Sequence, residues 1–293
     1  MEFEESDELT GPAEPGGAGR AVEALLEEVG EETQVQPAGH LGGFRGRTAI
    51  VTGGATGIGR RTAIEFARLG ANVAFNWVDL PGRSIAEEAA CFEQELQQLE
   101  VKVLSDCVDV RDAAAVNAFV ERVRTELGGL HYLVNCAGVH RSAPLWKLSD
   151  EQWQEVIDVN LTGAFNMIRA VAPTLRAQRF GKIVNIASVH AFAGSFGVAN
   201  YSASKSGLVG LTLASAAELG PANVNVNGVA PGYVRTDLLT DVPEEVVTAT
   251  RERAALKRLP EAEDVAHVVL FLCSEMARQI TGQVIRVDAG LLG

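Results

Sequence analysis

From Arg47 to the end of the chain, short apolar runs alternate with longer segments in which apolar residues recur at helical spacing. Short apolar runs predict strands at 48–52, 72–76, 101–105, 132–135, 182–186, 224–229 and 284–287. The segments between them have helical spacing, and they predict helices at 58–69, 85–99, 113–127, 150–175, 201–219 and 260–274. Strands that alternate with helices pair in parallel and are covered on both faces. The pattern therefore predicts an α/β protein with a single doubly wound parallel sheet over residues 44–293.

The first 43 residues lack this alternation. Residues 1–39 carry eleven acidic side chains and one arginine, so they hold −10 of the chain's net charge of −13. Their Gly, Pro and Ala content predicts a largely disordered extension with a short amphipathic helix at 21–32. Such an extension can be an inert solubilising tail or a regulatory, partner-binding arm, and the sequence leaves both open. The nearly neutral remainder has no basic face, which argues against nucleic acid or an anionic membrane as a partner.

Composition narrows the class of protein further. The chain of 293 residues is 47% hydrophobic, yet it has no uncharged apolar run of the roughly 18 residues that span a bilayer. Its start has neither the basic nor the apolar region of a signal peptide, so we expect a cytoplasmic protein. Its four cysteines form no Cys-x-x-Cys pair, and its five histidines never fall at i, i+4 spacing, so we expect no metal site.

A glycine-rich turn joins the first predicted strand to the first helix. The sequence Thr52-Gly-Gly-Ala-Thr-Gly-Ile-Gly59 has glycines at 53, 57 and 59, where the backbone can approach a ligand closely. A dinucleotide pyrophosphate binds at such a helix N-terminus in doubly wound folds. The spacing is Gly-x-x-x-Gly-x-Gly rather than Gly-x-Gly-x-x-Gly, so the turn alone is also compatible with a merely tight connection.

Three further positions suggest carbonyl chemistry. Tyr201 and Lys205 stand four residues apart on a predicted helix, so their side chains leave the same face. A free phenol with a pKa of about 10 is a poor acid or base at neutral pH, and a neighbouring ammonium group stabilises the phenolate. We therefore expect Lys205 to lower the pKa of Tyr201. Ser188 follows the strand at 182–186, at the sheet edge where such folds bind ligands, and its hydroxyl can hold a carbonyl oxygen.

Asn160 lies inside the helical stretch at 150–175. Asparagine disfavours a helix interior slightly, because its side chain competes for backbone hydrogen bonds. The position therefore suggests a bend or a bound water.

Together these motifs resemble those of the classical short-chain dehydrogenase/reductases. The glycine turn, Asn135-Cys-Ala-Gly138 and Pro231-Gly232 occur in the family's order, and Asn160, Ser188, Tyr201 and Lys205 match its catalytic tetrad. The resemblance covers roughly residues 44–293. It implies a Rossmann fold and an NAD(P)(H)-dependent oxidoreductase that reduces a ketone to a secondary alcohol, or catalyses the reverse.

The resemblance also implies roles for individual residues. Tyr201 would transfer the proton, Lys205 would also bind the nicotinamide ribose, and Ser188 would orient the substrate. Asn160 would support a proton relay from Lys205 to solvent. The cofactor-binding residues that it implies are Gly53, Thr56, Gly57, Ile58, Gly59, Asp79, Asp109, Val110, Asn135, Ala137, Gly138, Tyr201, Lys205, Pro231, Gly232, Val234 and Thr236.

Two observations on cofactor choice disagree. Asp79 lies twenty residues after Gly59, a spacing at which an acid binds the adenosine ribose and favours NAD. In the family comparison, however, the acid of NAD-dependent members corresponds to Trp77, while Arg60 and Arg83 are candidate partners of a 2′-phosphate. We expect NADP(H), with NAD(H) as the alternative.

For the substrate, residues 200–205, 229–233, 256–261 and 281–288 most resemble 3-oxoacyl-acyl-carrier-protein reductases, which favours a small 3-oxoacyl thioester. Alcohol, sugar and hydroxyacyl-CoA dehydrogenases share these motifs and stay as alternatives, as does a non-catalytic dinucleotide-binding regulator. The absence of Lys and Arg from 206–223 counts against docking of an acidic carrier protein. We expect residues 236–257 to form a mobile helical lid, with His140 and His190 as candidates for the cleft wall.

The predicted helix from Gly207 to Leu219 is apolar or small on nearly every side. A sheet covers only one side of a helix, so a helix of this kind needs a second cover. We expect a homo-oligomer with its subunit interface there, and the family resemblance implies a tetramer.

Overall fold

The computed structural model describes residues 42–79, 82–235 and 244–292, and the statements below concern these residues. The described residues all belong to one compact unit, residues 37–293. The predicted disorder, the helix at 21–32 and Thr236 lie outside the described residues. The domain limits at residues 43 and 44 stay a prediction.

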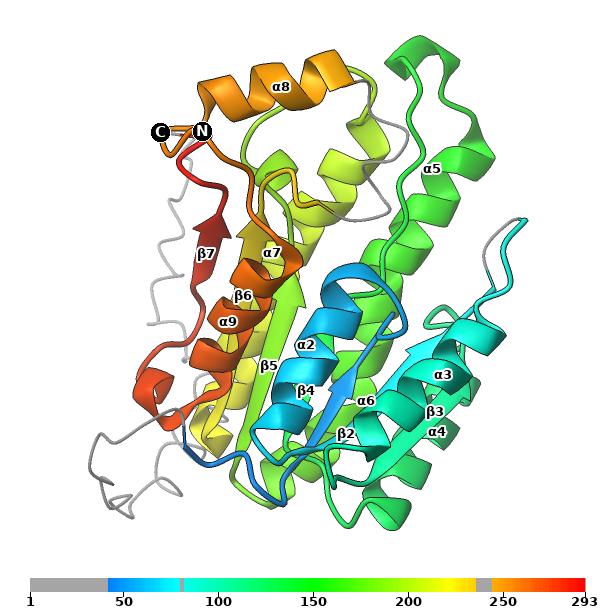
Figure 1. Cartoon of the computed structure of the whole chain (residues 1–293), viewed down its shortest axis with the longest axis vertical. Coiled ribbons are helices and arrows are strands. Elements are labelled where there is room, and N and C mark those ends of the chain that lie inside the picture. Colours follow the sequence, from blue (N-terminus) through cyan, green and yellow to red (C-terminus); the bar gives the residue numbers. More distant parts are fainter. Residues whose placement is uncertain (1–41, 80–81, 236–243, 293) are drawn as a thin grey trace, which may run out of the picture. The chain divides into compact units, whose positions relative to one another are not determined.

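A seven-stranded parallel sheet forms the centre of the fold (Figure 1). Its strands run in the order β3-β2-β1-β4-β5-β6-β7, and each neighbouring pair is parallel. The predicted doubly wound α/β sheet is therefore confirmed. The strands are β1 (Thr48–Val51), β2 (Asn72–Trp77), β3 (Val103–Cys107), β4 (Tyr132–Asn135), β5 (Gly181–Ile186), β6 (Val224–Pro231) and β7 (Val284–Val287).

The helices of the described residues are α2 (Gly57–Arg68), α3 (Ala86–Gln97), α4 (Ala113–Glu126), α5 (Asp150–Ile157), α6 (Gly163–Ala177), α7 (Ala199–Leu219), α8 (Glu244–Arg253) and α9 (Ala262–Cys273). The expected helical lid at 236–257 contains α8, which lies beyond the carboxyl ends of the strands (Figure 1). None of these described helices combines the length and apolarity that crossing a membrane requires.

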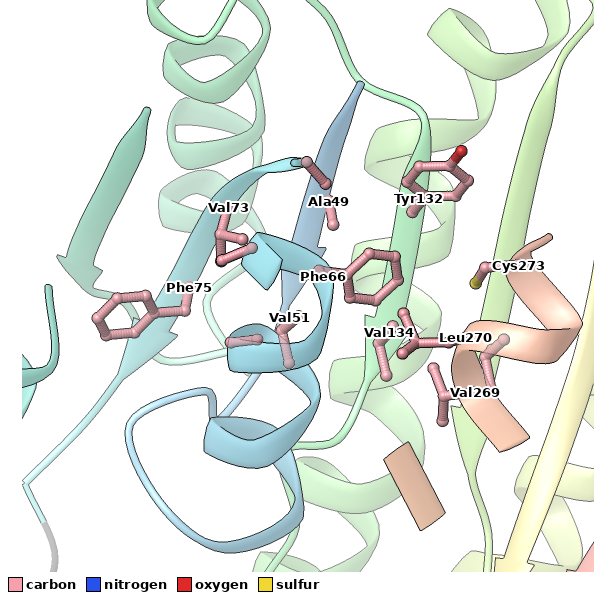
Figure 2. Packing of buried hydrophobic residues seen from close by; sticks show 14 of the residues in the cluster. Ala49, Val51, Phe66, Val73, Phe75, Tyr132, Val134, Val269, Leu270 and Cys273 are labelled. Atoms are coloured by element: carbon pink, nitrogen blue, oxygen red, sulfur yellow. The ribbon is translucent and has the colours of Figure 1, made fainter. Parts of the chain in front are cut away.

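Alternate residues of each strand supply two cores, one on each face of the sheet. On one face Val51 and Val134 pack with Phe66 of α2 and Leu270 of α9, as Figure 2 shows. On the other face the intervening strand residues pack with α4, α6 and α7. Burial on both faces explains why the strands read as nearly continuous apolar runs.

A π-helical turn, Asp158–Thr162, separates α5 from α6. Asn160, which suggested a bend or a bound water, lies in this turn. The helix predicted at 150–175 is therefore two α-helices joined by a π-helical turn. Such π-turns place one extra residue in a helix and often occur at functional sites.

Candidate active site

The predicted site residues come together at one edge of the sheet. β1, β4, β5 and β6 are consecutive in the sheet and parallel, so their carboxyl ends meet. Gly53 follows β1, Asn135 ends β4, Ser188 follows β5, and Pro231 ends β6. This is the edge at which doubly wound sheets bind ligands.

The glycine turn has no room for side chains. Gly53 and Gly57 have φ values of +61° and +51°, which favour glycine. A Cβ on Gly59 would lie 2.4 Å from the carbonyl oxygen of Gly53. Thr56 precedes α2 but makes no side-chain hydrogen bond to it, so the N–H groups of the first turn, which include that of Ile58, have no side-chain cap. The turn therefore packs closely against its own backbone and leaves the N–H groups of the first turn of α2 as donors for a pyrophosphate.

The loop after β4 is fixed against this turn. The hydroxyl of Thr52 accepts hydrogen bonds from the N–H groups of Cys136 and Ala137, each at 3.0 Å. Asn135 donates from Nδ2 to Oδ1 of Asn185 at 2.8 Å, while its own Oδ1 is buried without a partner. An unpaired buried acceptor is costly unless a ligand satisfies it. Together with the glycine turn, this oxygen fits the cofactor that the sequence predicts.

Tyr201 lies in the first turn of α7, and its environment governs its protonation. Burial raises the pKa of Tyr201 to about 12, although a hydrogen bond with Ser188 lowers it. We expected Lys205 to lower this pKa below that of a free phenol. The net direction in the structure is opposite, because desolvation disfavours the phenolate more than its partner stabilises it. Burial of Tyr201 therefore favours its protonated form.

Lys205 follows one turn later on the same face of α7 and is buried. Its Nζ donates to the carbonyl oxygen of Ile186 at 2.7 Å and lies 5.6 Å from the centre of the Tyr201 ring. Burial lowers the pKa of Lys205 to about 8. The predicted proximity of the two side chains is present, and Lys205 can exchange its proton near physiological pH.

Asn160 connects the π-helical turn to the rest of the site. Its Oδ1 accepts from the N–H of Val139 at 2.8 Å, and its Nδ2 donates to the carbonyl of Val139 at 3.0 Å and to Oγ of Ser204 at 3.1 Å. A Cβ on Gly138 would lie 3.3 Å from Asn160 Oδ1 and 3.6 Å from Lys205 Nζ. A side chain at position 138 would therefore crowd both Asn160 and Lys205.

Ser188 precedes a short 3-10 helix, Val189–Ala191, and its hydroxyl accepts from the N–H of His190 at 3.2 Å. It caps that helix and also bonds Tyr201. The ring of His140 lies 4.9 Å from that of Tyr201, centre to centre, and the ring of His190 lies 6.0 Å away. Burial lowers the pKa of both histidines. Two imidazoles thus flank the tyrosine, and of the two His190 lines the cavity beside it, while His140 is hydrogen-bonded to Ser142.

The candidate residues for the adenosine end are engaged in local bonds. Asp79 accepts from the N–H of Ile85 at 2.7 Å and from the hydroxyl of Ser84 at 3.2 Å, so it holds the start of α3. Arg60 pairs with Glu95 and lies over the ring of Phe92.

The other arginine proposed for the 2′-phosphate, Arg83, pairs with both carboxylate oxygens of Glu88. Asp109 is bound by Arg111, whose hydrogen bonds lower the pKa of that carboxyl. Val110 is buried, at a point where a Cβ on Gly163 would collide with it.

The loop after β6 completes the edge. The N–H of Gly232 donates to the carbonyl of Val287 at 2.9 Å, and a Cβ at Gly232 would lie 3.0 Å from Cα of Asp288. Val234 is buried. The sequence analysis missed Tyr233, whose ring lies 6.0 Å from that of His190. Its position directly after Pro231-Gly232 was the available signal.

Comparison with known proteins agrees with this geometry. A family model described as enoyl-(acyl carrier protein) reductase matches residues 53–292. The 3-oxoacyl-[acyl-carrier-protein] reductase FabG of Thermotoga maritima is 38% identical over 249 residues, which cover 85% of this chain and 99% of that protein. The FabG of Staphylococcus aureus (strain Mu50) is 37% identical over 245 residues, or 84% and 98% of the two chains.

A solved structure from Sinorhizobium meliloti, described as a short-chain alcohol dehydrogenase, superposes with a TM-score of 0.78 at 34% identity. It covers 85% of this chain and 97% of the other. The family match extends over the glycine turn, the residues around Tyr201 and the last strand. The chain therefore belongs to the short-chain dehydrogenase/reductase family and is an oxidoreductase that uses a nicotinamide dinucleotide.

Proposed function

We propose that this enzyme reduces the 3-oxo group of an acyl thioester to a secondary alcohol, with NADP(H) as its preferred cofactor. The observation that carries the chemistry is the placement of Tyr201, whose buried phenol lies beside Ser188 and one helical turn before Lys205. Reduction of a carbonyl needs a proton donor at the oxygen, and a phenol held in this position can be that donor.

The residues of the site divide this work among them. A bound nicotinamide dinucleotide would supply the hydride for the carbonyl carbon. Ser188 holds the carbonyl oxygen by a hydrogen bond, and Tyr201 donates its proton to that oxygen as negative charge develops. Lys205 binds the nicotinamide ribose and, with its pKa of about 8, returns a proton to Tyr201.

Asn160 supports the resupply of that proton through its position. Both polar groups of its side chain are bound to Val139 and Ser204. We infer that it holds the loop after β4 and the π-helical turn beside Lys205.

The preference for NADP(H) is supported by the local charges. β2 ends at Trp77, which cannot accept hydrogen bonds from ribose hydroxyls, and the carboxylate of Asp79 holds the start of α3. Arg60, beside the glycine turn, can exchange the exposed Glu95 for a phosphate that carries more charge.

The relatives support a thioester substrate, because they are named as 3-oxoacyl-[acyl-carrier-protein] reductases and this chain matches nearly their whole length.

The test is fluorescence titration with NADPH and NADH, followed by assays of a short 3-oxoacyl thioester, a 2-enoyl thioester, a sugar and a simple ketone. Preferential NADPH binding with turnover of the 3-oxoacyl thioester supports the proposal. Preferential binding of NADH, together with turnover of an alcohol or a sugar, would instead identify the enzyme as a catabolic dehydrogenase. Binding without any turnover favours a regulator.

We further propose that the enzyme is a tetramer, with α7 at a subunit interface. Leu213 on α7 is 51% exposed, and Phe165 on α6, which packs against α7, is 43% exposed. Exposed apolar side chains on neighbouring helices are typical of subunit contacts.

A further inference from the structure

We propose that Asn200, the residue before Tyr201, is a positioning residue for the reaction. It fixes the first turn of α7 against α5 and against the loop after β4, and so sets where the phenol of Tyr201 meets the substrate. This inference rests on the proton transfer assigned to Tyr201 in the proposed function, and it applies to any carbonyl or alcohol substrate.

The side chain of Asn200 is buried, and every one of its polar groups has a partner. Asn200 is the second residue of α7 and is 0% exposed. Its Nδ2 donates to the carbonyl oxygens of Arg141 and Gln152, each at 3.1 Å, and its Oδ1 accepts from the N–H of Tyr201 at 2.8 Å. An amide has two donor hydrogens and one acceptor oxygen. Asn200 uses them to join three segments: the loop after β4, α5 and α7.

The bond to Tyr201 replaces a missing helix cap. The first N–H groups of a helix have no carbonyl partner within it. Val198 precedes α7 and provides no side-chain cap. The Oδ1 of Asn200 accepts one of these N–H groups, that of Tyr201. The side chain that attaches α7 to its neighbours therefore also holds the main chain of the tyrosine.

The loop after β4 gives Asn200 a fixed point of attachment. The guanidinium of Arg141 bonds both carboxylate oxygens of Glu155 on α5, at 2.8 and 2.6 Å, and this pair is partly buried. Two parallel bonds of this kind fix geometry as well as supply energy. Two residues further on, the N–H of Ala143 donates to the carbonyl of Gly197, just before α7, at 3.0 Å. The carbonyl of Arg141 that Asn200 binds is thus held from both sides.

The same loop also contacts the ring of Tyr201. The ring of His140 lies edge to face with it, 4.9 Å away between ring centres and at an interplanar angle of 81°. His140 is held in turn, because its carbonyl accepts from Arg141 at 3.0 Å and its Nδ1 bonds the hydroxyl of Ser142 at 3.2 Å. Asn200 therefore controls Tyr201 twice, through the main chain of the tyrosine and through the loop against which its ring packs.

The three bonds require an amide. Aspartate has the same shape and can accept from the N–H of Tyr201, but it would turn a second oxygen toward the carbonyls of Arg141 and Gln152. Alanine would leave these groups unpaired in the interior. Either change should shift the first turn of α7, and a displacement of about 1 Å at a reacting group can slow a reaction about 10²-fold.

The test measures the single-turnover rate constant for oxidation of bound NADPH by a short 3-oxoacyl N-acetylcysteamine thioester in a stopped-flow instrument. Asn200→Ala and Asn200→Asp should lower this rate constant about 10²-fold, while the Kd for NADPH should stay within about twofold. Unfolded protein lowers the amplitude and leaves the rate constant of the folded enzyme unchanged, so the rate constant separates positioning from stability. Asn200→Asp keeps the shape of the side chain and decides the question if Asn200→Ala does not fold.

Asn225→Ala is the matched control. Asn225 is also buried, and its Nδ2 donates to the carbonyls of Arg278 and Ile280, at 3.0 and 2.9 Å, while its Oδ1 accepts from Lys182 at 2.7 Å. It lies near the first residue of β6, whereas the site lies at the last. Its replacement should lower the urea midpoint about as much as Asn200→Ala does, and the single-turnover rate constant should stay within about twofold of wild type.

Amide hydrogen exchange of the apoenzyme separates this inference from the proposed function, because it needs no substrate. Asn200→Ala should speed exchange about tenfold in residues 139–143 and 199–205, and Asn225→Ala should leave these segments unchanged. If wild type reduces no 3-oxoacyl thioester, the proposed substrate fails, yet faster exchange confined to these segments still supports the positioning role. Unchanged exchange would overturn the inference, and so would a single-turnover rate constant within about twofold of wild type in the Asn200 variants.

Discussion

The side chain of Asn160 binds the main chain of Val139 at both of its hydrogen-bonding groups, through a 2.8 Å bond to Oδ1 and a 3.0 Å bond from Nδ2. Asn160 lies in the π-helical turn and Val139 lies in the loop after β4, so the two bonds join segments that the sequence separates by 21 residues. A third bond, to Ser204, adds α7 to the same connection.

Replacement of Asn160 by alanine should therefore destabilise the protein. The loss leaves the main-chain groups of Val139 without these partners, and we expect unfolding to become easier by about 2 kcal/mol. Urea denaturation of the apoenzyme measures the difference. Asn117→Ala on α4, an exposed asparagine, should change stability by less than about 0.5 kcal/mol. Equal stability of wild type and Asn160→Ala would contradict the structural role.

Tyr201→Phe should remove turnover. The ring and its packing stay, while the proton donor is lost, so kcat should fall about 10³-fold and the affinity for the dinucleotide should change less than about twofold. Stopped-flow kinetics and fluorescence titration measure the two quantities. Tyr233→Phe is the comparison, because it removes a neighbouring phenol of the same site, and its kcat should fall far less than that of Tyr201→Phe. If Tyr201→Phe retained near wild-type turnover, the assigned mechanism would be wrong.

The lowered pKa of Lys205 predicts a specific dependence of stability on pH. Burial moves this pKa from 10.5 to about 8, so between these values the unfolded chain binds more protons than the folded protein. The contribution of Lys205 to the free energy of unfolding should then rise as the pH increases from about 8 to 10.5. Below pH 8 the folded protein bears the full cost of burying the charged ammonium group. Comparison with Lys205→Met isolates the effect. The stability of wild type relative to this variant should increase from pH 8 to pH 10, and a constant difference would count against the burial of a charged Lys205.

Arg60→Ala should weaken NADPH more than NADH. Loss of a charged hydrogen-bond partner of the 2′-phosphate should raise the Kd for NADPH about tenfold or more, and the Kd for NADH should stay within about twofold. Arg68→Ala, which removes another paired arginine from α2, is the matched control and should leave both affinities unchanged. Equal effects of Arg60→Ala on the two cofactors would remove Arg60 from cofactor selection.

A charge on the exposed face of α7 should disrupt the proposed assembly. Leu213→Glu would place a carboxylate in a desolvated interface, so the oligomer should dissociate at micromolar concentration. Leu99→Glu, at another partly exposed leucine, serves as the control and should leave the assembly intact. Sedimentation velocity distinguishes the outcomes, and a stable wild-type monomer would exclude this interface.

The order of strands and helices could be predicted from the sequence because each element carries its own period. The run Thr48–Val51 is apolar because both faces of β1 are buried, and α2 begins where the glycine turn ends. The parallel topology then places the carboxyl ends of β1, β4, β5 and β6 at one edge. Local pattern and topology together were sufficient to place Ser188, Tyr201 and Lys205 in one site.

Other properties arise only when distant segments meet. The expected lowering of the Tyr201 pKa was wrong in the structure, because a sequence shows which charge is near but not how much water is excluded. Asp79 has the spacing of a ribose ligand, yet the tertiary structure uses it to hold the start of α3.

The sequence by itself determined the fold and identified the candidate residues of the catalytic centre, since hydrophobic period and motif spacing are local properties of the chain. The tertiary structure alone decided the burial that raises the pKa of Tyr201 and the cavity between Val189, Ala249 and Leu292. Desolvation and cavity shape depend on which surfaces come into contact, and residues about fifty positions apart carry no local sign that they will do so.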